Sequence, residues 1–164
     1  MAERRDPHRI LLIGVGNTLM QDDGIGVHVA RAIAADATLA PVITCVDGGT
    51  IGLALLPELE DSALLILVDA SELNANPGHI AVFHDREIDR QLSNKRRSVH
   101  EVALTDLLSA AAIRGRLPQR RVLVAIQPQS TDWGLDLTAP VKAAMPAVLK
   151  TIREITLVWL DEAA

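Results

Sequence analysis

The chain has 164 residues, which is the ordinary size of a single folded domain. We expect residues 1–164 to form a single domain. Hydrophobic residues make up 49% of the sequence but aromatic residues only 2%, so the core must be built from aliphatic side chains. The net charge of -5 argues against nucleic acid as a partner, because phosphate binding needs a concentrated cationic face. The one dense basic run, Lys95 to Arg97, is expected to be a solvated loop.

The composition also predicts a compartment. The single cysteine, Cys45, excludes an internal disulfide and the common four-ligand thiolate zinc patterns. No stretch approaches the roughly 18 apolar residues that a membrane helix needs. The apolar run from Ile10 to Val15 is too short for the core of a signal peptide. We therefore expect a cytoplasmic protein that has no membrane partner.

The first half of the chain alternates apolar strands with short helices. Continuous apolar runs predict three buried strands, over residues 10–15, 42–46 and 64–68. After a loop over residues 17–23, apolar residues at four-residue intervals predict a helix, with the stripe Ile25, Val29 and Ile33. A short Leu-rich helix containing Pro57 is expected between the second and third strands.

The second half begins with a half-polar strand over residues 80–83, followed by a charged, irregular stretch to Arg97. Ser98-Val99-His100-Glu101 has the form of a capping box and predicts the start of a helix, which Gly115 ends. The last clear strand covers residues 121–126. Thr138 is expected to cap a long C-terminal helix, which Pro146 should kink.

This order of elements predicts an α/β fold with three layers. We expect a mostly parallel, twisted sheet of about five strands with helices on both faces. Ligands of such sheets bind at the carboxyl edge, where the strand order reverses. If the strand order begins 2-1-3, Asp23 and Asp69 face each other across that point.

Three polar residues are candidates for a site at this edge. One of Asp22 and Asp23 is expected to cap the first helix, which leaves the other free. Asp69 follows five apolar strand residues, where a carboxylate is costly to desolvate unless a cation, a donor cluster or solvent receives it. His100 should be the second residue of its helix, where the positive end of the helix dipole keeps the imidazole neutral. Together, Asp23, Asp69 and His100 would form an incomplete shell for a first-row metal, and nickel and zinc both fit.

Other functional motifs are incomplete. Gly14-Val15-Gly16 imitates the dinucleotide-binding fingerprint, but Leu19 occupies the place of its third glycine. The following helix also begins too late for its N-terminus to hold a pyrophosphate. The sequence contains no Gly-x-Ser-x-Gly elbow and no Walker-type loop. No resident organic cofactor is therefore expected.

The sequence contains several polar and glycine-rich blocks in a fixed order: Gly14-Val15-Gly16-Asn17, Asp22-Asp23-Gly24-Ile25-Gly26, Asp47-Gly48-Gly49-Thr50, Val68-Asp69-Ala70 and Ser98-Val99-His100. Together these blocks resemble the maturation endopeptidases of nickel-iron hydrogenases. The resemblance covers nearly the whole chain, from Arg9 to the C-terminal helix. It implies that Asp23, Asp69 and His100 form a metal-contacting site. Many members carry glutamate where Asp23 stands.

The resemblance also implies a task. Such a protease removes a short C-terminal extension from the hydrogenase large-subunit precursor after nickel insertion. The substrate's nickel is then the recognition element and not a resident cofactor. Asp23, Asp69 and His100 would hold this nickel, which orients the scissile bond and polarises its carbonyl or activates water, with Asp47 as a candidate base. Attack by a carboxylate-activated water, as in an aspartic-type peptidase, is the alternative mechanism.

Two other functions rank lower. A nickel carrier or chaperone without catalysis would usually need more soft or histidine ligands than these three. A dinucleotide-dependent oxidoreductase is disfavoured by the missing glycine. A monomer is the expected state of the protein.

Overall fold

The computed structural model describes residues 6–49, 52–93 and 99–163. The strands are β1 Asp6–Val15, β2 Ile43–Gly49, β3 Ser62–Ala70, β4 Ile80–His84 and β5 Arg120–Ile126. The α-helices are α1 Ile25–Ala34, α2 Leu56–Glu60, α3 Arg86–Leu92, α4 Val99–Ile113 and α5 Ala139–Ala163. Two short 3-10 helices are η1 Gln21–Gly24 and η2 Leu53–Leu55.

All five strands form one sheet in the order β2-β1-β3-β5-β4. β1 pairs in parallel with both β2 and β3, and β3 pairs in parallel with β5. Only β4, on one edge of the described sheet, runs antiparallel to its neighbour. The predicted α/β fold and its 2-1-3 beginning are therefore confirmed, and the strand order reverses between β1 and β3.

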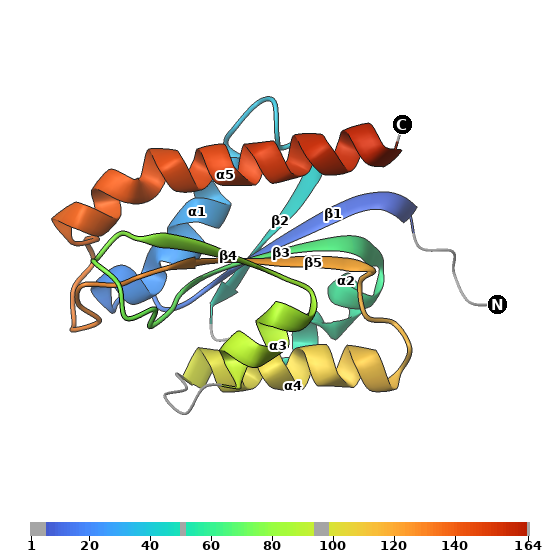
Figure 1. Ribbon diagram of the computed structural model, residues 1–164, viewed down its shortest axis with the longest axis horizontal. Helices are drawn as coiled ribbons and strands as arrows, with labels where there is room; N and C mark the ends of the chain where they lie inside the picture. The colour runs from blue at the N-terminus through green and yellow to red at the C-terminus, as the bar shows by residue number, and fades with distance from the viewer. Residues whose placement is uncertain (1–5, 50–51, 94–98, 164) are drawn as a thin grey trace.

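The sheet is the middle of three layers (Figure 1). Helices α1 and α5 cover one face, and α2, α3 and α4 cover the other. Side chains of successive strand residues alternate between two apolar clusters: Ile10 and Leu12 pack with α1 and α5, whereas Leu11 and Ile13 pack with α4. The central strand β3 is buried on both faces, which explains its uninterrupted apolar sequence.

Two elements differ from the sequence prediction. The stretch predicted to be irregular contains α3, which buries Ile88 and Leu92 one helical turn apart. Its apolar pattern has only these two residues among many charges, too few to indicate a helix from the sequence. Strands β2 and β3 also extend further than predicted, so that Asp47 and Asp69 are strand residues and not the first residues of loops.

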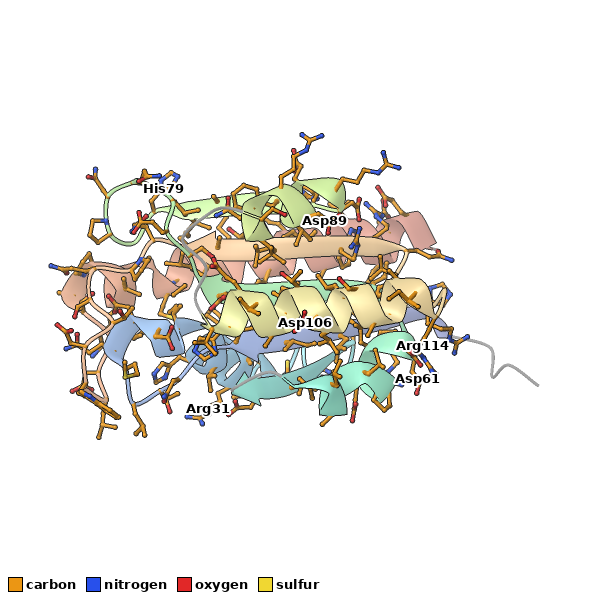
Figure 2. All side chains as sticks on the ribbon, turned by 90° about the horizontal axis from the view of Figure 1, so that it is seen from below. Arg31, Asp61, His79, Asp89, Asp106 and Arg114 are labelled. Atoms are coloured by element: carbon orange, nitrogen blue, oxygen red, sulfur yellow. The ribbon has the colours of Figure 1, made fainter. Side chains whose placement is uncertain are left out.

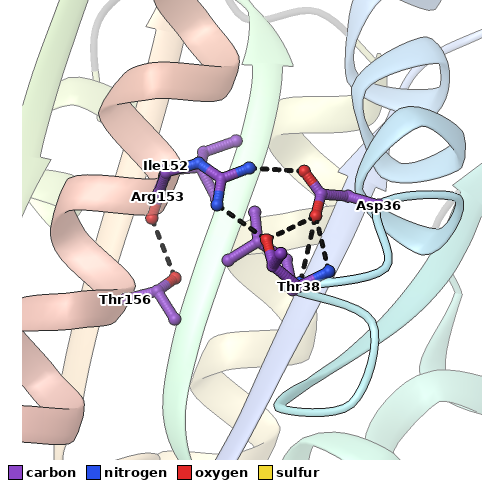
Figure 3. A network of polar contacts seen from close by, with 6 residues as sticks. Asp36, Thr38, Ile152, Arg153 and Thr156 are labelled. Atoms are coloured by element: carbon purple, nitrogen blue, oxygen red, sulfur yellow. Dashed lines mark hydrogen bonds and ion pairs between the residues drawn. The ribbon is translucent and has the colours of Figure 1, made fainter.

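The long helix α5 is attached to the turn that follows α1. Arg153 donates hydrogen bonds to Asp36 at 2.5 Å and to the hydroxyl of Thr38 at 2.7 Å (Figure 3). The helix continues through Pro146 without interruption. No helix in the described ranges is long and apolar enough to cross a bilayer. The predicted capping residue Ser98 and the basic run ending at Arg97 lie outside the described residues.

Candidate functional site

Asp69 lies near the carboxyl end of β3, on the face that α4 covers. Leu65 and Leu67 point into the apolar cluster beneath α4, and the alternation of the strand gives Asp69 the same direction. Its neighbour on β5 is Ala125, whose small side chain belongs to that cluster. Asp69 is only 1% exposed, and neither carboxylate oxygen has a hydrogen-bond partner among the described residues.

Asp23 and His100 meet beside this strand end, although 77 positions separate them. The Nε2 of His100 lies 3.0 Å from the Oδ2 of Asp23. The same oxygen accepts a hydrogen bond from the backbone N–H of Asn17 at 2.9 Å. Asp23 comes from η1, which follows β1, and His100 is the second residue of α4, as predicted. Both side chains are largely buried.

The environment raises the pKa of Asp69 well above its usual value. Burial is the main cause, because it penalises the charged form, and the negative charges of Asp23 and Glu101 act in the same direction. The positive charge of His100 opposes the shift only in part. Asp69 therefore keeps its proton to a higher pH than an ordinary aspartate does.

The hydrogen bond between Asp23 and His100 shifts both pKa values in the direction of an ion pair. For Asp23, burial acts to raise the pKa, but the hydrogen bonds from His100 and Asn17 outweigh it and the pKa is lowered. The pKa of His100 is raised, first by the hydrogen bond to Asp23 and then, against the effect of burial, by nearby carboxylates. The helix dipole was expected to disfavour the charged imidazole, but the pKa shift has the opposite direction, because the direct carboxylate contact outweighs the dipole.

Close backbone contacts explain why glycines surround Asp23. Gly16 has a φ of +127°, and a Cβ at this position would lie 1.7 Å from the carbonyl oxygen of Asp23. A Cβ on Gly26 would lie 2.2 Å from the carbonyl oxygen of Val68, at the end of the neighbouring strand. Only glycine allows η1 and α1 to approach the ends of β1 and β3 so closely. These contacts place Asp23 at the edge of the sheet where Asp69 lies.

Neither of the adjacent aspartates caps a helix, contrary to the prediction. The residues at the N-terminal ends of η1 and α1 are Met20 and Gly24, and neither makes a side-chain capping hydrogen bond. Asp22 is fully buried and accepts four hydrogen bonds from the loop before α5, from the backbone N–H groups of Gln129, Ser130 and Thr138 and from the hydroxyl of Thr138. This anchoring role was missed because no local sequence signal links positions more than 100 residues apart.

Asp47 has partners outside the other three candidates. Its carboxylate pairs with Arg31 at 3.1 Å and accepts a hydrogen bond from the backbone N–H of Gly49 at 3.0 Å. It lines a pocket of about 190 Å³ together with Asn17. Asp47 is not among the charges that shift the pKa values of Asp23, Asp69 and His100.

The structure therefore brings three of the four candidates into one electrostatic unit. Asp23 and His100 are in direct contact, and Asp69 is close enough to sense both charges. Within the described ranges, no three His, Cys, Asp or Glu side chains already converge as ligands of a single ion. To hold an ion, the three side chains would have to turn toward a common point, and the hydrogen bond between Asp23 and His100 would have to open.

Comparison with known proteins assigns the chain to a family. The family model described as hydrogenase maturation protease matches residues 27–155. The chain belongs to the hydrogenase maturation protease family. Among curated relatives, the hydrogenase 2 maturation protease of Escherichia coli is 37% identical over 152 residues, covering 89% of this chain and 92% of the relative. The hydrogenase expression/formation protein HupD of Rhizobium leguminosarum is 36% identical, over 92% of this chain and 75% of the relative.

Solved structures of family members have the same fold. The hydrogenase maturating endopeptidase HybD of Escherichia coli is 32% identical and has a TM-score of 0.82, with 95% of this chain and 94% of that chain covered. The hydrogenase maturation protease HybD of Thermococcus kodakarensis has a TM-score of 0.77 at 25% identity, over 90% of this chain and 99% of that one. The chain is thus an endopeptidase of hydrogenase maturation.

Proposed function

We propose that the protein removes a C-terminal extension from the large-subunit precursor of a nickel-iron hydrogenase, and that nickel already bound to the precursor is its recognition element. The observation that carries this proposal is the buried carboxylate of Asp69, which lies beside the contact between Asp23 and His100 and has no hydrogen-bond partner in the described part of the chain. A buried carboxylate of this kind is costly unless a cation receives it.

The side chains of Asp23, Asp69 and His100 are suitable ligands for nickel that the substrate carries. Asp23 and Asp69 supply carboxylate oxygens, and His100 supplies an imidazole nitrogen, which are ligand types that first-row divalent metals accept. When the ion enters, it takes the place of the proton that Asp23 and His100 share, and it neutralises the negative charge that burial disfavours on Asp69. Binding would therefore deprotonate both His100 and Asp69.

Two mechanisms are open to this site. In the first, nickel held by the three side chains orients the scissile bond and polarises its carbonyl, and a base such as Asp47, once released from Arg31, activates water. In the second, the carboxylates act alone as in an aspartic-type peptidase. In this second mechanism the lowered pKa of Asp23 suits the role of base, and the raised pKa of Asp69 suits the role of acid.

Processing of the cognate precursor tests the nickel proposal. Purified protein is mixed with nickel-loaded and with nickel-free large-subunit precursor, and the products are weighed by mass spectrometry. We expect loss of the C-terminal extension only from the nickel-loaded form. Equal trimming of both forms would contradict nickel recognition and leave the carboxylate mechanism.

Substitutions test the residue assignment. Asp69→Ala and His100→Ala should each lower processing by at least about 100-fold, since each removes a group that acts on the reacting centre. Matched controls are Asp106→Ala, on the outer side of α4, and His79→Ala, in the loop before β4 (Figure 2). Both controls are exposed and should process normally. Full activity of either test variant, with a folded circular dichroism spectrum, would remove that residue from the site.

A further inference from the structure

One of the two tryptophans lies on the surface. The whole sequence contains two tryptophans, one phenylalanine and no tyrosine. Trp159 is 4% exposed and packs in the core, whereas Trp133 is 78% exposed, in the loop before α5. Tryptophan is strongly enriched in the central residues of protein interfaces. In a protein with so few aromatic side chains, this exposed ring needs a functional explanation.

Two other exposed apolar side chains lie close to Trp133. A parallel bridge pairs Met20 with Gly134, and Gly134 exchanges backbone hydrogen bonds with both neighbours of Met20, at 2.8 and 2.9 Å. The pairing brings Leu19, which is 49% exposed, alongside Trp133 and Leu135, which is 70% exposed. We call these three residues, Leu19, Trp133 and Leu135, the apolar rim.

Hydrogen bonds to Asp22 fix the loop that carries Trp133 and Leu135. The buried carboxylate of Asp22 binds three backbone N–H groups and one hydroxyl of the loop that carries Trp133. The backbone N–H of Asp22 in turn donates to the carbonyl of Ser130 at 3.1 Å. A surface ordered in this way loses little conformational entropy when a partner binds.

The apolar rim is continuous with the candidate site. The backbone N–H of Leu19 donates to the side chain of Asn17 at 2.9 Å, and the backbone N–H of Asn17 donates to Asp23. In Figure 1 the loop between β5 and α5 lies at the same end of the sheet as η1 and the first turn of α4. A protein that brings its backbone to Asp23 and His100 must therefore cover the neighbouring rim.

We propose that Leu19, Trp133 and Leu135 form a docking surface for an apolar patch on the folded body of the precursor, next to its cleaved segment. The inference rests on the proposed function, because it assumes that the occupant is the protein substrate. Contacts at the rim would be made equally in the bound precursor and in the transition state, so their loss would raise KM and leave kcat unchanged.

Steady-state kinetics on the cognate nickel-loaded precursor test this assignment. We expect Trp133→Ala to raise KM at least tenfold while kcat stays within twofold, and Leu135→Ser to raise KM by a smaller factor. The matched control is Leu157→Ser, which changes a 58% exposed leucine at the far end of α5 and should leave both constants unchanged. A wild-type KM for Trp133→Ala would overturn the docking surface and leave the proposed function intact.

Two further measurements separate the other outcomes. If the wild-type protein does not process the precursor, the proposed function fails, and fluorescence anisotropy of labelled precursor then reads binding directly. Weaker binding by Trp133→Ala than by Leu157→Ser would still support the docking surface, and equal binding would overturn it. Sedimentation velocity tests a second copy of this chain as the occupant. If the wild-type protein is a dimer, and Trp133→Ala dissociates it without changing KM, the occupant of the apolar rim is a second copy of this chain and not the precursor.

Discussion

Two buried carboxylates at the same edge of the sheet have opposite surroundings. Asp22 is 0% exposed and Asp69 is 1% exposed. Four donors from a distant loop surround Asp22, whereas Asp69 has no hydrogen-bond partner among the described residues. Both lie near the point where the strand order reverses. Asp22 lies in η1, which follows β1, and Asp69 lies near the end of β3.

The difference separates an architectural aspartate from a reactive one. A carboxylate with all its hydrogen bonds made stabilises the fold and has nothing left to offer a ligand. A buried carboxylate without partners weakens the fold and is retained where a ligand or a reaction needs it. The comparison therefore predicts that substitution of Asp22 costs stability, and that substitution of Asp69 costs activity but not stability.

Asp22→Ala should have the largest effect on stability. It leaves three backbone N–H groups and the hydroxyl of Thr138 without their acceptor, so we expect a loss of about 3–4 kcal/mol in the free energy of unfolding. Urea unfolding followed by circular dichroism measures it. Processing should also fall by about tenfold or more, because the loop that Asp22 anchors borders the site.

The control for this substitution is Asp132→Ala in the same loop. Asp132 is exposed and, among the described residues, its hydrogen bonds are with Ser130, so its removal should cost less than about 0.5 kcal/mol. Equal destabilisation by both substitutions would show that Asp22 has no special anchoring role. The proposed difference between a structural Asp22 and a functional Asp69 would then be wrong.

Much of the fold follows from the sequence because its signals are local and strong. The apolar runs of β1 and β3 and the stripe of Ile25, Val29 and Ile33 each specify an element within about ten residues. Helix α3 was not predicted because its apolar residues, Ile88 and Leu92, are too few to form a pattern. The ends of β2 and β3 were set too early, because strand pairing with β1 and β5 extends the ladder into polar residues.

The site was predictable only in part. The contact between Asp23 and His100 and the burial of Asp69 agree with candidates chosen from the chemistry of their positions. The expected direction of the pKa shift of His100 was wrong, since that shift depends on a carboxylate 77 residues away. For the same reason, one of Asp22 and Asp23 was expected to cap the first helix, and neither does. Long-range partners fix what a polar residue does, and one sequence does not reveal them.

Asp69→Asn should stabilise the protein at neutral pH. The folded state holds a carboxyl whose pKa is well above its unfolded value near 3.9, so an unfavourable contribution grows as the pH rises from that value to the folded pKa. Removing the ionisable group should raise the free energy of unfolding by about 1–3 kcal/mol at pH 7.5. The gain should vanish near pH 3.5, where the carboxyl is protonated in both states. Thermal unfolding at the two pH values measures it.

Asp106→Asn on the same face of the molecule is the matched control and should change stability little at either pH. The activity of Asp69→Asn should be lost although the protein is more stable, the combination expected of a functional residue. A destabilised Asp69→Asn at pH 7.5 would mean that the carboxylate makes favourable contacts in the folded state and would end the contrast with Asp22.

The smallest expected effect on stability concerns the hydrogen-bonded pair of Asp23 and His100. Because the pKa of His100 is raised, its contribution to stability is fully present below its unfolded pKa near 6.5 and is lost as the pH rises through the folded pKa. The pKa of Asp23 is lowered, so its contribution is present above about pH 4 and is lost as the pH falls through the folded pKa. The coupling between the two residues should therefore be greatest between about pH 4 and 6.5.

A double-mutant cycle with Asp23→Asn and His100→Ala isolates this coupling, because burial and packing losses that each substitution causes alone cancel in the cycle. We expect a coupling free energy about 1 kcal/mol larger at pH 5.5 than at pH 9, as for a charge-assisted hydrogen bond that loses one of its charges. A coupling that does not change with pH would mean that His100 stays neutral against Asp23. The ring would then be free to bind an ion without losing a proton, and nickel affinity would depend on the ionisation of Asp69 alone.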